Sequence, residues 1–255
     1  MIEVLTPARL TLARATGALV AEILQTLKTR TVPGTNLLDI DRWAQDMIVR
    51  AGAESCYVDY APPFGRGPFG HYICTSVNDA VLHGLPHDYA VADGDLVSLD
   101  LAVSLRGVVA DSAVSFVVGT PREEDLRLIE VTEQALAAGV AAALPGARVG
   151  DISAAIGAVI EGAGYEANTE FGGHGVGSTM HQDPHIPNNG VPGRGYRLRP
   201  GLLLAIEPWV MTDTVDLAVD ADGWTLRSST GCRTAHSEHT VAITEYGAEV
   251  FTLRP

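Results

Sequence analysis

The sequence predicts an α+β protein made of two similar halves, in which helices and strands occupy separate runs. An internal repeat supports this: Pro33–Gly52 superposes on Pro145–Gly164 at a constant offset of 112 residues, and both copies begin with Pro-Gly and end with Ala-Gly. Each half also shows helical spacing of apolar residues followed by strand-like sequence. We therefore expect a single domain, residues 1–255, whose halves, about 1–119 and 120–255, share a curved antiparallel sheet with a site between them.

Each half is expected to open with two helices. Thr6-Pro7 and Thr120-Pro121 each combine a capping residue with proline at the first helical position. The apolar residues at helical spacing are Leu10, Ala13, Leu19, Ile23 and Leu27 in the first half and Leu128, Val131, Leu136 and Val140 in the second. Chance recurrence of Pro-Gly and Ala-Gly punctuation is the alternative to a true duplication.

Residues 96–118 alternate between two faces, as expected for a hairpin. Asp100 lies on the face of small residues, and a turn at Arg106-Gly107 is expected to place Asp111 about opposite Asp100. Like charges in that arrangement are destabilising, and Arg106 is the only cation in this stretch. A chance acidic pair on a surface hairpin is one explanation. The apolar flanks favour the other, a pair of carboxylates that bridges metal ions.

Three more candidate ligands follow: His174 in a glycine-rich stretch, Glu207 at the end of an apolar strand, and Glu238 in the strand-like sequence 235–243. Carboxylates are rarely buried without a partner, so we expect two divalent metal ions at this set. The oxygen-rich donors suit Co, Mn or Fe(II) and can also hold Zn. Two such ions can activate a water and polarise a carbonyl, which indicates hydrolysis of an amide or ester.

Composition limits the partners. The net charge of −14 argues against nucleic acid or an anionic membrane as a partner. Neither a signal-peptide core nor an apolar run of membrane-spanning length is evident, so we expect a cytoplasmic protein. The three cysteines are an odd number without Cys-x-x-Cys spacing, and we expect them to be free thiols.

The motifs together resemble those of the type I methionine aminopeptidases in their short bacterial form, in order and spacing over nearly the whole chain. The motifs are Asn78–Pro86, the Asp100 and Asp111 pair, Gly-His-Gly-Val-Gly at His174, His181, Ile206-Glu207-Pro208 and Ser237-Glu238-His239-Thr240. The resemblance implies the pita-bread fold with a dimetal site at its centre. It also implies removal of N-terminal methionine from nascent proteins, at the ribosome, and from peptides with a small second residue, by a monomer in which a water or hydroxide bridging the metals attacks.

The resemblance also implies roles for individual residues. Asp111 and Glu238 would bridge both metals, Asp100 would chelate one, and His174 with Glu207 would bind the other. Glu207 would also shuttle a proton. The catalytic histidines would be His83 and His181, which contact the substrate and steady charge on the scissile carbonyl. For the methionine side chain, Cys74 and Trp224 match the family, and further candidates by position are Phe64, Phe69, Tyr72 and Met180.

Two rival functions and one departure from the family remain open. An Xaa-Pro peptidase of the same fold would use similar ligands, although such enzymes usually carry an N-terminal domain for which we expect no room. A non-catalytic pita-bread protein that binds a protein or RNA would usually lack ligands, and all five are present. The loop Ala61–Gly70 departs from the tyrosine-bearing stretch expected there, so core packing is the alternative role for these aromatic residues.

Overall fold

The computed structural model describes residues 2–62 and 66–254. Two helices from each half are described: α1 (Pro7–Arg30) and α2 (Leu37–Arg50) in the first half, and α3 (Glu123–Ala142) and α4 (Val149–Gly162) in the second. The helices α2 and α4 both have 14 residues and begin and end at positions 112 apart. The preceding turns contain Gly34 and Gly146, each with a φ of 91°, a conformation that glycine adopts readily. The predicted helix pairs are therefore confirmed.

The two first helices begin differently. Thr6 caps α1, since its Oγ1 accepts a hydrogen bond from the Arg9 N–H at 3.4 Å, and proline follows it as predicted. Helix α3 has Arg122 as its N-cap, so the start predicted at Thr120-Pro121 was wrong by two residues. The Thr120 N–H donates instead to Asp93 Oδ1 at 2.7 Å. The acidic first turn, Glu123–Asp125, compensates for the missing threonine cap because its negative charges complement the helix dipole.

Within the part of the chain that the structure describes, the strands form four hydrogen-bonded sheets in which all pairs are antiparallel. The first contains β1 (Glu54–Ser55), β2 (Cys74–Val77), β4 (Leu96–Leu105) and β5 (Val108–Val117). Two small sheets contain β3 (Ala80–Leu82), β10 (Leu217–Val219) and β11 (Leu226–Ser228), and β9 (Trp209–Met211) with β12 (Thr234–His236). The last contains β6 (Gly172–Gly175), β7 (Gln182–Pro187), β8 (Leu203–Ile206), β13 (His239–Thr244) and β14 (Gly247–Val250).

The β4–β5 hairpin corrects the predicted register. Its two-residue turn has φ of 53° at Arg106 and 74° at Gly107, the positive values of a turn that suits the twist of paired strands. This turn places Ala113 opposite Asp100 and Ala102 opposite Asp111. Asp100 and Asp111 therefore share a face but are diagonal neighbours, still within reach of each other's side chains, rather than directly opposed.

Side-chain hydroxyls join the first sheet to the last. Thr240 Oγ1 on β13 accepts the Asp111 N–H at 2.8 Å and donates to the Asp111 carbonyl at 2.7 Å. Ser112 Oγ donates to the Glu238 carbonyl at 2.6 Å. The backbones that carry two of the predicted ligands are thus tied together across the halves.

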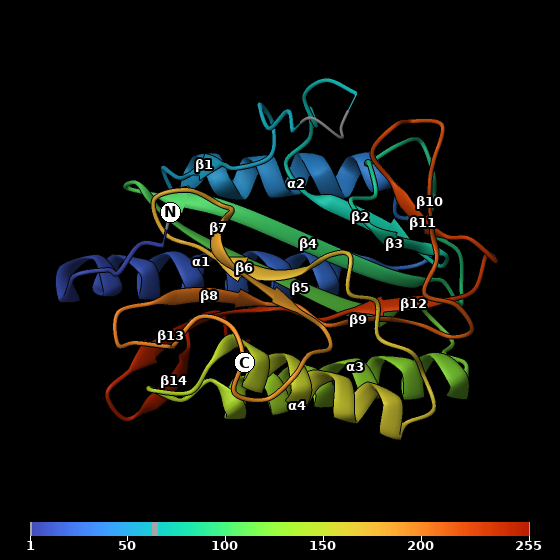
Figure 1. The fold of residues 1–255 in the computed structure, drawn as a ribbon. Coiled ribbons are helices and arrows are strands. Elements are labelled where there is room, and N and C mark those ends of the chain that lie inside the picture. Colours follow the sequence, from blue (N-terminus) through green and yellow to red (C-terminus); the bar gives the residue numbers. More distant parts are fainter. Residues whose placement is uncertain (1, 63–65, 255) are drawn as a thin grey trace.

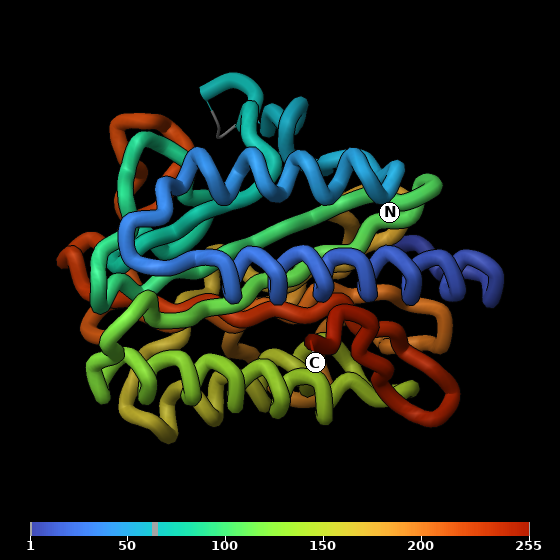
Figure 2. The backbone as a smooth tube through the Cα atoms, turned by 180° about the vertical axis from the view of Figure 1, so that it is seen from behind, coloured from blue at the N-terminus to red at the C-terminus, as the bar shows by residue number. Residues whose placement is uncertain are grey.

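The helices cover one side of the strands, and the predicted ligands face the other. Figure 1 shows α2 and α1 along the first sheet with α3 and α4 along the last, and Figure 2 shows α1, α2 and α3 against the back of the strands. Leu99, Leu101 and Val103 of β4 pack among the side chains of α1 and α2. Because side chains alternate along a strand, Asp100 points away from these helices. Within the described residues, no helix has the length and apolarity needed to cross a membrane.

Candidate metal centre and substrate cavity

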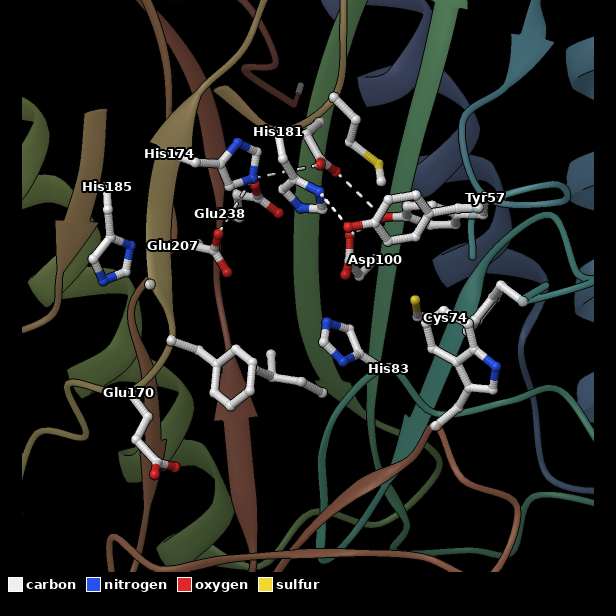
Figure 3. Close-up of a pocket in the computed structure, with 18 residues that line it drawn as sticks. Tyr57, Cys74, His83, Asp100, Glu170, His174, His181, His185, Glu207 and Glu238 are labelled. Carbon is white, nitrogen blue, oxygen red and sulfur yellow. Dashed lines mark hydrogen bonds and ion pairs between the residues drawn. The ribbon is translucent and has the colours of Figure 1, made fainter. Parts of the chain in front are cut away.

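The five predicted ligands line one cavity of about 310 Å³ (Figure 3). Ligand atoms of Asp111, His174 and Glu238 all lie within 4.8 Å of one another. His174 Nε2 is 3.5 Å from Glu207 Oε1 and 3.9 Å from Asp111 Oδ2. The carboxyl of Asp100 is in hydrogen-bond contact with that of Asp111. The fold thus brings together side chains from both halves of the chain.

Glycines allow β6 to present His174 to the cavity. A Cβ atom on Gly173 would lie 2.3 Å from the Ala205 carbonyl oxygen, and one on Gly175 would lie 2.1 Å from that of Asp183. Strand β6 can therefore sit between β7 and β8 only without side chains at these positions. His174 Nδ1 donates to the Gly175 carbonyl at 3.0 Å, which leaves Nε2 with its lone pair toward the carboxylates.

Glu207 and Glu238 lie where two neighbouring strands are interrupted at the same level. Glu207-Pro208 separates β8 from β9, and Ser237-Glu238 separates β12 from β13, so the continuous strand expected over 235–243 is broken. Proline cannot continue the ladder because it lacks an N–H. The Ser237 N–H donates to the Pro208 carbonyl at 3.1 Å, and the Glu238 N–H to Ala113 of β5 at 3.2 Å. The interruption directs both glutamates into the cavity.

The raised pKa values of the four carboxyl groups favour the binding of cations. Burial raises the pKa of Asp100 to about 6, and burial with the negative charge of Asp100 raises the pKa of Glu207 to about 8. Burial and the neighbouring carboxylates raise the pKa of Asp111 and of Glu238 well above the usual range. Arg254 lowers the pKa of Glu238, but less than burial and the carboxylates raise it. These carboxylates are therefore costly to ionise together without bound cations.

The same residues fit divalent metal ions. Burial lowers the pKa of His174 to about 3, so the imidazole is neutral and able to donate a lone pair. Four carboxylates and one neutral imidazole make an oxygen-rich donor set that suits Mn, Fe(II) or Co and can accept Zn. Bound ions would neutralise the crowded negative charge, which explains why so many carboxyl groups are buried together.

The two predicted catalytic histidines lie beside the ligands. His83 follows β3 with a φ of 56°, a left-handed conformation that is uncommon for a residue with a side chain. Burial and His181 lower its pKa to about 4, so it is neutral. His181 lies directly before β7, and the register of the β6–β7 pair shifts between Gly173 and Gly175. The ring centres of His174 and His181 are consequently 4.4 Å apart.

Aromatic and sulfur-containing side chains form the rest of the cavity wall. The wall includes Cys74, Phe69, Met180 and Trp224. The rings of Phe69 and Trp224 pack edge to face, with 5.2 Å between ring centres. Tyr72 is not among the described lining residues; its hydroxyl accepts a hydrogen bond from Gln45 at 2.9 Å. Phe64 lies outside the described residues.

Sequence reasoning missed two tyrosines in the cavity. The hydroxyl of Tyr57 is 2.7 Å from Asp100 Oδ1, and that of Tyr60 is 3.0 Å from His181 Nδ1. Both lie between β1 and β2 in a segment without helical or strand periodicity. The only sequence signal for them is the three-residue spacing of the two tyrosines in Tyr57-Val58-Asp59-Tyr60. Such spacing is equally compatible with side chains that line a cavity and with side chains packed in the core.

Comparison with known proteins agrees with this geometry. The sequence model of metallopeptidase family M24 matches residues 11–245. Methionine aminopeptidase 1 of Bacillus subtilis is 39% identical over 253 residues, which cover 99% of each chain. The chain belongs to the methionine aminopeptidases of metallopeptidase family M24. The methionine aminopeptidase of Clostridium acetobutylicum is 40% identical over 94% of each chain.

Solved structures of other proteins share this fold. The crystal structure of methionine aminopeptidase from Thermotoga maritima matches with a TM-score of 0.94 at 36% identity over 99% of both chains. The prolidase of Pyrococcus furiosus matches with a TM-score of 0.77 at 20% identity, and the chain covers 66% of it. The prolidase likeness shows the fold alone. The predicted α+β pita-bread fold and the predicted enzyme family are therefore confirmed.

Proposed function

We propose that this protein removes the N-terminal methionine from nascent proteins and from peptides whose second residue is small. The observation that carries the proposal is the position of five candidate ligands, three buried and two half-buried, beside an aromatic, sulfur-lined wall in one cavity. The full-length likeness to methionine aminopeptidases supports it. In the proposed substrate complex, the apolar wall holds the methionine side chain and the ligands lie at the scissile bond.

The metal centre is proposed to hold two divalent ions, either Co, Mn, Fe(II) or Zn. Asp111 and Glu238, whose ligand atoms lie within 4.8 Å of each other and of that of His174, are the proposed bridging carboxylates, and Asp100 would bind one ion and His174 and Glu207 the other. Bound ions supply Lewis acidity toward the carbonyl and lower the pKa of a water.

The remaining chemistry belongs to side chains of this chain. Glu207 would accept a proton from the attacking water and pass it to the departing amine, which is general acid–base catalysis. His83 and His181 would hold the substrate backbone and donate N–H groups toward the carbonyl oxygen as negative charge develops there. The ring contact between Tyr60 and His181, 5.4 Å between ring centres, supports a fixed orientation of His181.

The substrate side chain is proposed to lie among Cys74, Phe69, Met180 and Trp224. Thioether sulfur makes favourable contacts with aromatic ring edges, which suits a methionine side chain. We further propose that residues 1–255 form one catalytic domain with halves at about 1–119 and 120–255, and that the protein acts as a cytoplasmic monomer on chain N-termini emerging from the ribosome.

A direct assay tests the activity. The protein, treated with a chelator and then supplied with Mn, Co or Fe(II), is incubated with Met-Ala-Ser and, separately, with a peptide of the form Xaa-Pro-Ala. Release of free methionine from Met-Ala-Ser, abolished by the chelator and restored by metal, is expected. Cleavage of the Xaa-Pro peptide alone would indicate an Xaa-Pro peptidase, and cleavage of neither would favour a non-catalytic binding protein.

A further inference from the structure

Tyr57 reaches the metal ligands from a segment that the proposed mechanism does not use. Its side chain is buried, and its hydroxyl lies 2.7 Å from Asp100 Oδ1 and 3.4 Å from Asp111 Oδ1 (Figure 3). The segment is fixed locally because Ser55 Oγ accepts the Tyr57 N–H at 3.1 Å. The ring of Tyr57 packs edge to face against Phe69, with 5.6 Å between ring centres. Backbone and ring are thus both held in place.

The direction of the hydrogen bond follows from the groups involved. An ionised carboxylate accepts hydrogen bonds only, and a phenol with an ordinary pKa near 10 keeps its proton at neutral pH. The single hydroxyl proton belongs to the shorter contact, so Tyr57 donates to Asp100. This hydrogen bond occupies one side of the Asp100 Oδ1 atom. Asp111 remains close because it is the diagonal neighbour of Asp100 on the same face of the β4–β5 hairpin.

We propose that Tyr57 is a positioning residue that fixes the carboxylate of Asp100 for metal binding. This role rests on the metal centre proposed above and adds a residue to it. The Gly175 carbonyl does the same for His174 by holding Nδ1. Partners of this kind orient metal ligands, and losing one typically lowers metal affinity by about 10–100-fold. Without Tyr57, Asp100 would keep its contacts with the Asp111 carboxyl and the Cys74 thiol but would lose the hydroxyl that fixes the orientation of its carboxylate.

The test compares Tyr57→Phe with the matched control Tyr89→Phe. The Tyr89 hydroxyl also donates to an aspartate, Asp95 Oδ2 at 2.8 Å, but it lies outside the lining of the metal cavity. Metal-free wild-type protein and both variants are titrated with Co(II) at fixed pH, and the visible absorption of the bound cobalt is recorded. We expect Tyr57→Phe to bind Co(II) about tenfold more weakly or worse, with an altered absorption spectrum, and Tyr89→Phe to match wild type.

The outcomes separate this role from the proposed function. A folded Tyr57→Phe that binds Co(II) with the wild-type Kd and spectrum would overturn the role of Tyr57 and leave the metal centre standing. Wild-type protein that binds no Co(II) would overturn the metal centre and this role with it. If circular dichroism shows that Tyr57→Phe is misfolded, Tyr57→Met, which also has no hydroxyl, is titrated with the same expected results.

Discussion

Three histidines, two in the cavity and one outside its lining, differ in the group that contacts their Nδ1 atom. His174 Nδ1 donates to the Gly175 carbonyl and turns Nε2 toward carboxylates. His181 Nδ1 meets the Tyr60 hydroxyl at 3.0 Å, whereas His239 Nδ1 meets Thr252 Oγ1 at 2.9 Å, away from the cavity lining. Because the nitrogen that is held decides where the other one points, these partners separate a candidate ligand, a candidate substrate contact and a structural histidine.

Replacing His181 should slow turnover without removing metal. We expect His181→Ala to lower kcat for Met-Ala-Ser by about 100-fold or more, the usual effect of losing a donor to developing carbonyl charge. The metal content per chain, measured by atomic emission, should equal that of wild type because none of the five ligands changes. His87→Ala is the control, since His87 is exposed and bonds to the Leu85 carbonyl within its own loop. Loss of metal from His181→Ala would make His181 a ligand instead.

At the scale of elements, the three proposed ligands of the second half lie where strands are short or interrupted, whereas Asp100 and Asp111 lie within ten-residue strands. Strand β6 has four residues, and β8 ends immediately before Glu207. Long helices such as α1 depend on local signals, apolar spacing and caps, and the sequence predicts them well. The break at Ser237-Glu238 and the shifted start of α3 depend on contacts with Pro208 and Asp93 from distant parts of the chain. No local pattern encodes such contacts, so sequence reasoning missed them.

Gly173 tests how closely β6 must approach its neighbour. We expect Gly173→Ala to lower the free energy of unfolding by about 2–3 kcal/mol, because the new Cβ would lie 2.3 Å from a backbone oxygen that cannot easily move. At a domain of this size, that corresponds to a fall of roughly 4–12 °C in Tm. Metal affinity should fall as well, since His174 is the next residue.

The matched control for that substitution is Gly162→Ala at the end of α4. A Cβ there would meet nothing within 4 Å, and alanine favours the helix, so we expect stability to be unchanged or raised by about 0.5 kcal/mol. Urea unfolding of both variants supplies the comparison. Equal stability of Gly173→Ala and wild type would show that β6 can shift outward without cost.

Across the whole molecule, the site exists only when the halves meet. Asp100 and Asp111 come from the first half, and His174, Glu207 and Glu238 from the second. The sequence singles out these five because buried charge among apolar residues is conspicuous, and the fold brings them to one cavity; their role as metal ligands stays a prediction. Tyr57 and Tyr60 could not be predicted from pattern, since a tyrosine in an irregular segment serves a core or a cavity equally well. The diagonal placement of Asp111 required the turn geometry at Arg106-Gly107.

Because the proposed ligands come from both halves, metal removal should lower the stability of the whole chain. Without cations, the crowded carboxylates repel one another or take up protons. The link that bound metal ions would form between the two halves is also lost. At free metal about 100 times Kd, each bound ion should contribute about 2.7 kcal/mol, or roughly 5–11 °C in Tm per ion. Differential scanning calorimetry with chelator and with added Mn or Co measures this difference.

The variant Glu238→Ala tests whether bound metal stabilises the chain through this residue. The variant loses a proposed bridging ligand and also one of the buried like charges, so its metal-free form should be at least as stable as metal-free wild type. Added metal should then raise its Tm far less than that of wild type, and methionine release should fall with metal content. If wild type melts at the same temperature with and without metal, the ions do not link the halves; if Glu238→Ala gains as much from metal as wild type, Glu238 is not a ligand.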